Sequence, residues 1–178
     1  MRCCSNTAYK EISMKQYQGL EFDKLKEEDI EELTKIMERA FDEDARIHLN
    51  EPKGGPEGYD NGEFLRKWGF YPGTEAYKIS EGGKPIGGVI LWIDRTTNVN
   101  SLGNIFLDVN RQNSGTGKLV WDFIEQEYPD TVKWCTETAA FSRRNHHFYV
   151  NKCGFHVVRI EKPMDFREGS YILVKDMK

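Results

Sequence analysis

The stretch that decides the fold begins Ile105-Phe106-Leu107-Asp108-Val109 and continues, two residues later, as Gln112-Asn113-Ser114-Gly115-Thr116-Gly117-Lys118. Its first part is a short apolar run, which is typical of a buried strand. Its second part is a polar turn with two glycines. From Gly117 to Tyr128 the apolar residues recur at helical spacing, and Pro129 ends the pattern. The sequence therefore predicts a strand, a glycine turn and an amphipathic helix in succession.

The position of this turn gives it a chemical meaning. The start of a helix leaves backbone N–H groups without partners and carries a positive potential. Glycines at positions 115 and 117 would let a bulky anion approach that backbone, so the turn is a candidate cradle for a phosphate or pyrophosphate. A P-loop is excluded because Gln112 and Leu119 replace its Gly and its Ser or Thr. A dinucleotide fingerprint is excluded because Val120 replaces its third glycine.

Upstream of the turn the sequence predicts two helices and four strands. The first helix starts at Ile30 and its apolar pattern ends at Phe41, before a Gly- and Pro-rich segment from Asn50 to Tyr59. Asp60 is the predicted N-cap of a second, shorter helix. The strands, of which the middle two form a hairpin, are Leu20–Leu25 at a sheet edge, Ala76–Ile79, Ile86–Ile93 and Leu102–Val109.

Downstream of the turn the pattern predicts a strand over Val132–Thr138 and a helix over Ser142–Lys152, with Ser142 as its N-cap. Two last strands are predicted at Phe155–Ile160 and Ser170–Val174. This order predicts one α+β domain with a mixed, mostly antiparallel central sheet flanked by helices. The domain is expected to cover residues 19–178, after a loose leader over residues 1–18.

Composition excludes several classes of function. The chain of 178 residues contains no apolar run long enough for a membrane span, and its polar start argues against a secretory signal. A formal net charge of -4 argues against nucleic acid as a partner. Cys3, Cys4, Cys135 and Cys153 form no C-x-x-C pair, so neither a metal site nor a disulfide framework is expected. These features favour a reduced, cytoplasmic protein.

A second motif lies about thirty residues after the turn and helps to interpret it. It consists of Asn145-His146-His147-Phe148-Tyr149, followed by Lys152-Cys153-Gly154-Phe155. In this order and spacing, the two motifs and the predicted elements resemble the GCN5-related N-acetyltransferase (GNAT) superfamily over nearly the whole chain. The resemblance implies transfer of the acetyl group of acetyl-CoA, the cosubstrate, to the primary amine of a small molecule or peptide. It implies direct attack in a ternary complex, without a metal.

The resemblance also assigns residues to roles. Backbone groups of the turn would hold the pyrophosphate, and the strand at Ile105–Leu107 would splay from its neighbour near Trp134 to pair with the pantetheine arm. Asn145 would hydrogen-bond that arm, and Tyr149 would protonate the departing thiolate as general acid. The residues implied in cofactor binding are Leu107, Asp108, Val109, Gln112, Asn113, Ser114, Gly115, Thr116, Gly117, Lys118 and Asn145.

The physical chemistry of the residues is compatible with these roles. Asn145 and Tyr149 are four apart, so one helix face presents both. A phenol has a pKa of ~10 and a thiol one of ~8.5, so proton transfer from the phenol to the thiolate is unfavourable by ~2 kcal/mol. The site must offset this difference. The resemblance implies an acidic residue on the strand before the turn as general base, but the stretch from Leu102 to Ile105 carries no carboxylate, which leaves the base unassigned. Glu137 is the first candidate for it and Asp108 the second.

Several alternatives stay open at this stage. The same fold could serve as a non-catalytic acyl-CoA sensor or regulatory module, and a generic nucleotide-phosphate binder is a further hypothesis. An acetyl-enzyme on a cysteine is disfavoured because neither Cys135 nor Cys153 has an evident partner base. His146 and His147 are adjacent and cannot easily share a metal ion, whereas His48 is a solvent histidine or lines the acceptor site. The acceptor pocket is expected between Phe41 and Phe70, and a homodimer is common for such folds.

Overall fold

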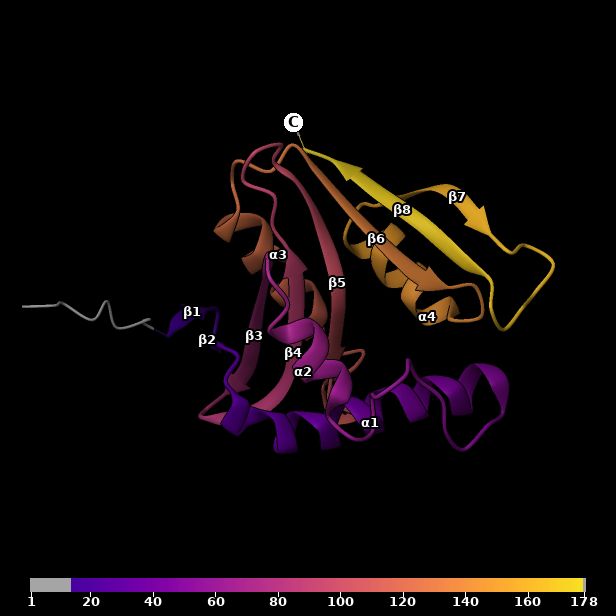
Figure 1. Ribbon diagram of the computed structural model, residues 1–178, viewed down its shortest axis with the longest axis horizontal. Coiled ribbons are helices and arrows are strands. Elements are labelled where there is room, and N and C mark those ends of the chain that lie inside the picture. The colour runs from indigo at the N-terminus through magenta and orange to yellow at the C-terminus, as the bar shows by residue number, and fades with distance from the viewer. Residues whose placement is uncertain (1–13, 178) are drawn as a thin grey trace, which may run out of the picture.

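The computed structural model describes residues 14–177, which form one eight-stranded sheet with helices on both faces (Figure 1). The strand order is β1-β2-β3-β4-β5-β6-β8-β7. Every neighbouring pair is antiparallel except β5 and β6, which run parallel. The predicted α+β fold with a mixed, mostly antiparallel sheet is therefore confirmed.

The elements follow the predicted order along the chain. The strands are β1 (Lys15–Tyr17), β2 (Leu20–Lys24), β3 (Thr74–Glu81), β4 (Lys84–Trp92), β5 (Val99–Leu107), β6 (Lys133–Ala139), β7 (His156–Glu161) and β8 (Ser170–Asp176). The helices are α1 (Ile30–Leu49), α2 (Glu63–Gly69), α3 (Thr116–Glu127) and α4 (Arg143–His146), the last of which continues as a π-helical turn (His147–Lys152). None of the helices within residues 14–177 combines the length and the apolarity that a bilayer crossing needs.

Two hydrophobic clusters divide the core between the faces of the sheet. On one face, which we call the α1 face, Ile36 and Met37 of α1 pack with Ile90 and Phe106. On the other, the α3 face, side chains of α3 and the π-helical turn pack against the sheet. The centre of this second cluster is the pair Trp121 and Trp134, both 0% exposed, with ring centroids 5.4 Å apart.

The N-terminal part differs from the prediction in three details. Lys15–Tyr17 forms β1 inside the predicted leader, so β1 and not β2 is the sheet edge, whereas residues 1–13 lie outside the described part. Helix α1 extends to Leu49 because Ala45 is buried and continues its apolar side beyond Phe41. The N-cap of α2 is Gly62 with φ of 85° and not Asp60.

The predicted helix over Ser142–Lys152 is only partly α-helical. Ser142 is its N-cap, as predicted, and its side chain accepts a hydrogen bond from the N–H of Asn145. After His146 the turn widens, and the N–H of Cys153 donates to the carbonyl of Phe148 five residues earlier, at 3.0 Å. Gly154, with φ of 81°, then leads into β7. Widened turns of this kind are frequently found at functional sites.

A β-bulge in β5 reverses which face its side chains occupy. Ile90 pairs with Asn104 and Leu91 pairs with Leu102, so Gly103 is the extra residue. Leu102 packs on the α3 face, whereas Phe106 packs on the α1 face. Because side chains alternate along a strand, Asn104 shares the α1 face with Phe106.

The parallel pairing of β5 with β6 is short. It joins Val99–Leu102 to Lys133–Thr136 and ends with the pair Leu102 and Thr136. Beyond that pair the two strands diverge (Figure 1), and we call the opening between them the split. The predicted splay of β5 is therefore present, but it does not begin near Trp134, because Trp134 still pairs with Asn100.

The tryptophan pair provides a test of the core. We expect Trp121→Ala to lower the free energy of unfolding by about 3–5 kcal/mol, because a fully enclosed indole leaves a cavity. Val158→Ala, at a side chain that is 53% exposed, should change it by about 0.5 kcal/mol or less. Urea denaturation followed by fluorescence and circular dichroism measures both, and equal effects of the two substitutions would contradict the assignment of the core.

Candidate functional site

The turn between β5 and α3 presents five unused backbone N–H groups. Those of residues 113–117 donate to no protein acceptor in the part of the chain that the structure describes. The neighbouring groups are used, because Gln112 donates to the carbonyl of Val109 at 3.4 Å and Lys118 to that of Gly115 at 3.0 Å. The candidate cradle is thus narrower than the predicted range from Gln112 to Lys118. Five donors at the start of a 12-residue helix fit an anionic group.

Left-handed backbone conformations shape this cradle. Asn113 has φ of 58° and Gly115 has φ of 87°, and a side chain at 115 would meet nothing within 4 Å. Gly117 has a different environment, because a Cβ there would lie 3.0 Å from the ring of Phe148. Gly117 therefore also serves packing between α3 and the π-helical turn, which its sequence pattern did not reveal.

Side chains of the turn hold it in shape. The Ser114 hydroxyl donates to the carbonyl of Arg111 at 2.7 Å, and it lies 2.8 Å from the hydroxyl of Thr116. The Gln112 amide donates to the carbonyl of Leu107 at 3.2 Å, and its oxygen accepts from Arg144 of α4. The turn is therefore preorganised, with a guanidinium beside it.

Tyr149, the predicted general acid, lies where the pairing of β5 and β6 ends. Only 6% of the residue is exposed, and it packs in the same cluster as Leu102 of β5. The Thr136 hydroxyl, which lies close enough to affect the pKa of the phenol, donates to the carbonyl of Leu102 at 2.9 Å, across the last register pair of the two strands. Burial raises the pKa of Tyr149, and the nearby Cys153 and, to a smaller extent, Asp44 add to the rise, whereas Thr136 opposes it. The phenol is therefore neutral and sits at the apex of the split on the α3 face.

Asn145 lies one turn before Tyr149 at the start of α4. Its main-chain N–H donates to the Ser142 hydroxyl oxygen at 3.4 Å, and its half-buried side chain has no hydrogen-bond partner among the described residues. The amide is therefore available to a ligand that enters the split.

The α1 face of the split carries two polar side chains. The side-chain oxygen of Asn104 is buried and has no hydrogen-bond partner within the described residues. Glu137 of β6 alternates with the buried Thr136 and Thr138, so it points to the α1 face, where it is exposed and accepts from the Ser170 hydroxyl. The sequence pattern did not mark Asn104 as a site residue, although it interrupts an otherwise apolar run.

The remaining sequence candidates have structural partners. Asp108 caps the 3-10 turn Val109–Arg111 and pairs with Arg39. Burial by itself would raise the pKa of Asp108, but the ion pair with Arg39 outweighs it, and the pKa is lowered. His146 contacts the carbonyl of Ala139 at 2.9 Å, and His147 contacts Asn151 at 2.7 Å. Among residues 14–177, no three His, Cys, Asp or Glu side chains are grouped to hold a metal ion.

A polar network that the sequence did not reveal joins α1 to α4. Asp44 of α1 is 6% exposed, and its carboxylate accepts from the Ser142 hydroxyl at 3.0 Å and from Arg144 at 2.9 Å. His48, one turn later, places Nε2 3.5 Å from the same carboxylate. Helices of opposite layers therefore meet at the open end of the split, where no strand separates them.

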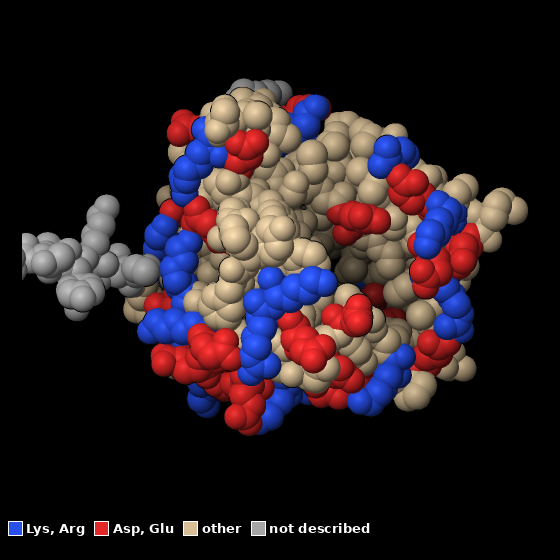
Figure 2. Space-filling view, in the orientation of Figure 1, with Lys and Arg blue, Asp and Glu red and all other residues tan. Residues whose placement is uncertain are grey.

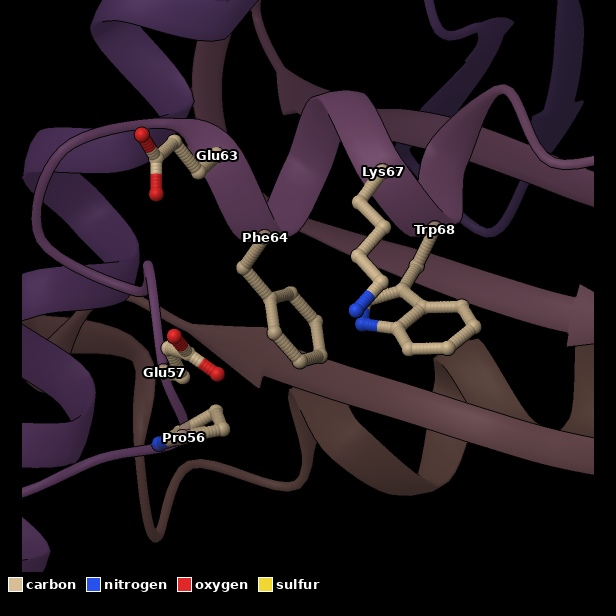
Figure 3. Close-up of a pocket in the computed structure, with 6 residues that line it drawn as sticks. All are labelled: Pro56, Glu57, Glu63, Phe64, Lys67 and Trp68. Atoms are coloured by element: carbon tan, nitrogen blue, oxygen red, sulfur yellow. The ribbon is translucent and has the colours of Figure 1, made fainter.

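The surface is hollowed at the split and again beside α2. Figure 2 shows a hollow between the diverging ends of β5 and β6, with acidic side chains beside it. A separate depression of about 420 Å³ lies beside α2, where Phe64 and Trp68 project from the same side of the helix and Glu57 of the preceding loop lies beyond Phe64 (Figure 3). No residue of the cradle or of the split lines this second opening, so it is distinct from the candidate cofactor site.

Comparison with known proteins agrees with this geometry. The model of the acetyltransferase (GNAT) family matches residues 30–155. A protein of Bacillus subtilis (strain 168), YrkN, is 38% identical over 133 residues, which are 75% of this chain and 71% of that protein. Residues 30–155, which the family model matches, contain the cradle, the split and Tyr149.

Solved structures with the same fold include three acetyltransferases. The ribosomal-protein-S18-alanine N-acetyltransferase of Escherichia coli has a TM-score of 0.67 and 18% identity over 88% of this chain and 93% of that chain. The PaiA N-acetyltransferase of Thermoplasma acidophilum, in complex with coenzyme A, has a TM-score of 0.68 and 17% identity over 89% and 99%. The spermidine N-acetyltransferase of Vibrio cholerae, in complex with CoA and spermine, has a TM-score of 0.63 and 15% identity over 89% and 95%.

The cysteines near the site allow a test of whether a thiol takes part in chemistry. Burial raises the pKa of Cys153 to about 12 and also raises that of Cys135. We therefore expect iodoacetamide at about pH 7.5 to leave both thiols unmodified in the folded protein, because the thiolate is the reactive form. Peptide mass mapping reports each cysteine separately, and denatured protein provides the fully modified control. Rapid alkylation of either thiol that coenzyme A prevents would instead favour an acetyl-enzyme.

Proposed function

The chain belongs to the acetyltransferase (GNAT) family, and on that premise we propose that it transfers the acetyl group of acetyl-CoA to a primary amine by direct attack. The acceptor is a small molecule or a peptide. The cofactor occupies the split, and the amine approaches from the α1 face.

One observation carries this proposal: the five free N–H groups of residues 113–117 lie at the open end of the split whose apex holds Tyr149. The cradle would hold the pyrophosphate by hydrogen bonds and by the positive potential at the start of α3. The edge of β5 beyond Leu102, which β6 leaves unpaired, is available to the amide groups of the pantetheine arm. The free amide of Asn145 supports the same path.

The two faces of the split suit the two halves of the reaction. On the α3 face, the neutral Tyr149 phenol can donate its proton to the sulfur as the C–S bond breaks. On the α1 face, the unpartnered oxygen of Asn104 can accept a hydrogen bond from the attacking amine. Holding both reactants in this geometry supplies much of the rate of such a transfer.

Burial affects both the acid and the group that it must protonate. The raised pKa of Tyr149 makes it a weaker proton donor than an exposed phenol. The same desolvation raises the pKa of the thiol that leaves in the split. The difference between the pKa values of the phenol and the thiol therefore grows by less than the rise at Tyr149.

The experiment that tests the function is release of free thiol from acetyl-CoA across a panel of primary amines. We expect at least one amine to respond, and Tyr149→Phe to lower kcat by about a hundredfold or more, because a positioned acid contributes that much. Coenzyme A affinity, measured by calorimetry, should stay within about threefold of the wild type, because the phenol does not touch the cradle.

Tyr17→Phe is the matched control, since Tyr17 lies on β1 at the sheet edge. It should leave kcat unchanged. Tight coenzyme A binding without turnover of any amine or peptide would identify a sensor module in place of an enzyme. Stabilisation by ATP equal to that by coenzyme A would indicate a general nucleotide-phosphate binder.

The direction of the Tyr149 pKa shift predicts the pH dependence of the rate. Because its pKa is raised, the phenol keeps its proton throughout the range in which the acceptor amine loses its own at ~10.4. We therefore expect kcat/KM to show no decline between pH 7 and about pH 10. A decline that begins near pH 8 and is absent in Tyr149→Phe would show that the phenol ionises early, contrary to its burial.

A further inference from the structure

The proposed reaction needs a group that removes a proton from the acceptor. An aliphatic amine with a pKa of ~10.4 is neutral in only about one molecule in a few thousand at pH 7. The carboxylates that the sequence offered are poorly placed for this task. Asp108 is held by Arg39 and by the 3-10 turn that it caps. Glu137 is exposed and accepts a hydrogen bond from Ser170.

Asp44 is an enclosed carboxylate at the edge of the split. Only 6% of the residue is exposed, and one of its oxygens accepts from Ser142 and from Arg144, both at the start of α4. Asp44 therefore lies at the open end of the split, where it contacts α4 although it comes from the opposite layer of the fold.

His48 follows Asp44 by one helical turn, so both side chains lie on the same side of α1. The imidazole is only 12% exposed, and its Nε2 is enclosed 3.5 Å from the Asp44 carboxylate without a hydrogen bond to it. Nδ1 is the nitrogen that remains for a substrate. Catalytic contacts in unliganded proteins are often long in this way and tighten when substrate binds.

The charges around His48 come from three elements. Asp44 on α1 is negative, and Arg144 on α4 partly balances it. Glu51, just past the end of α1, pairs with Arg167 of the loop between β7 and β8, while Glu43 pairs with Arg46 on the outer side of α1. Asp44 is thus the charged group in contact with the imidazole, and the two ion pairs beyond it are internally balanced.

We propose that His48 is the base that takes the proton of the acceptor ammonium, and that Asp44 is the positioning residue that orients its imidazole. This inference rests on the proposed function. The ammonium gives one proton to Nδ1, and the neutral nitrogen then forms the C–N bond with the thioester carbonyl. As the C–S bond breaks, Tyr149 protonates the sulfur and recovers a proton from the N–H⁺ of the intermediate, directly or through water. The imidazolium releases its proton to solvent, which completes the balance.

The arrangement places base and acid on opposite sides of the sheet. His48 approaches from α1, whereas Tyr149 approaches from the π-helical turn, and the thioester would lie between them in the split. The Asp44 carboxylate faces the imidazole and is itself oriented by donors of α4, in the way that a buried carboxylate orients a catalytic histidine.

The test compares His48→Gln with the wild type at pH 7 and at about pH 10, using the amine that responds best. At pH 7 we expect kcat/KM to fall by about a hundredfold or more. At about pH 10 the deficit should shrink to within about fivefold, because a large share of the amine is then already neutral. Thiol release without enzyme is subtracted at each pH, and coenzyme A affinity should be unchanged. Asp44→Asn should show the same pH-dependent recovery with a smaller deficit.

His156→Gln, at an exposed position of β7, is the matched histidine control and should behave as the wild type. A deficit of His48→Gln that is equal at both pH values would mean a structural role and overturn the proposal, and so would full activity at pH 7. Silence of the wild type across all amines would instead defeat the proposed function itself. The two failures are therefore distinguishable.

Discussion

The constraint on which the site depends is the early end of the pairing between β5 and β6. Four residues of each strand are joined, and the last pair is Leu102 with Thr136. Beyond it, backbone groups on the facing edges lack a strand partner, and unpaired backbone groups inside a protein are costly. Such an opening in the middle of a sheet persists only if other groups line it. Here Thr136, Tyr149 and the helices of both layers do so, which leaves an edge that a ligand can complete.

The split also brings the two layers of the fold into contact. Elsewhere the sheet separates the cluster of α1 from that of α3. At the open end, Asp44 contacts Ser142 and Arg144 directly, and Arg144 also contacts Gln112, next to the cradle. One connected polar network therefore touches the cradle, the start of α4 and the second half of α1. A substitution that removes one of the donors of Asp44 would leave its buried carboxylate partly unpaired, which carries a large desolvation cost. The three points are therefore coupled.

Much of this architecture follows from local sequence patterns. The glycine turn between an apolar run and an amphipathic helix predicts the cradle, since a helix start always leaves free N–H groups. The hairpin around Glu81–Lys84, the N-cap at Ser142 and the order of strands also agree with local rules. Asn145 and Tyr149 were identified by their spacing within a family motif. These features depend on residues close together in the chain, and short-range patterns carry that information.

Other features arise only when distant segments meet. The bulge at Gly103 turns Asn104 to the α1 face, and it depends on how β5 registers with β4. Gly117 is needed next to Phe148, which lies about thirty residues away. The contact of Asp44 with α4 joins residues about one hundred positions apart, so no local pattern could mark it. The sequence by itself determined the elements and the turn with free N–H groups before α3, because these follow from backbone chemistry and periodicity. Only the tertiary structure decided which polar side chains share the split, because that depends on where β5 and β6 part and on which helices fill the gap.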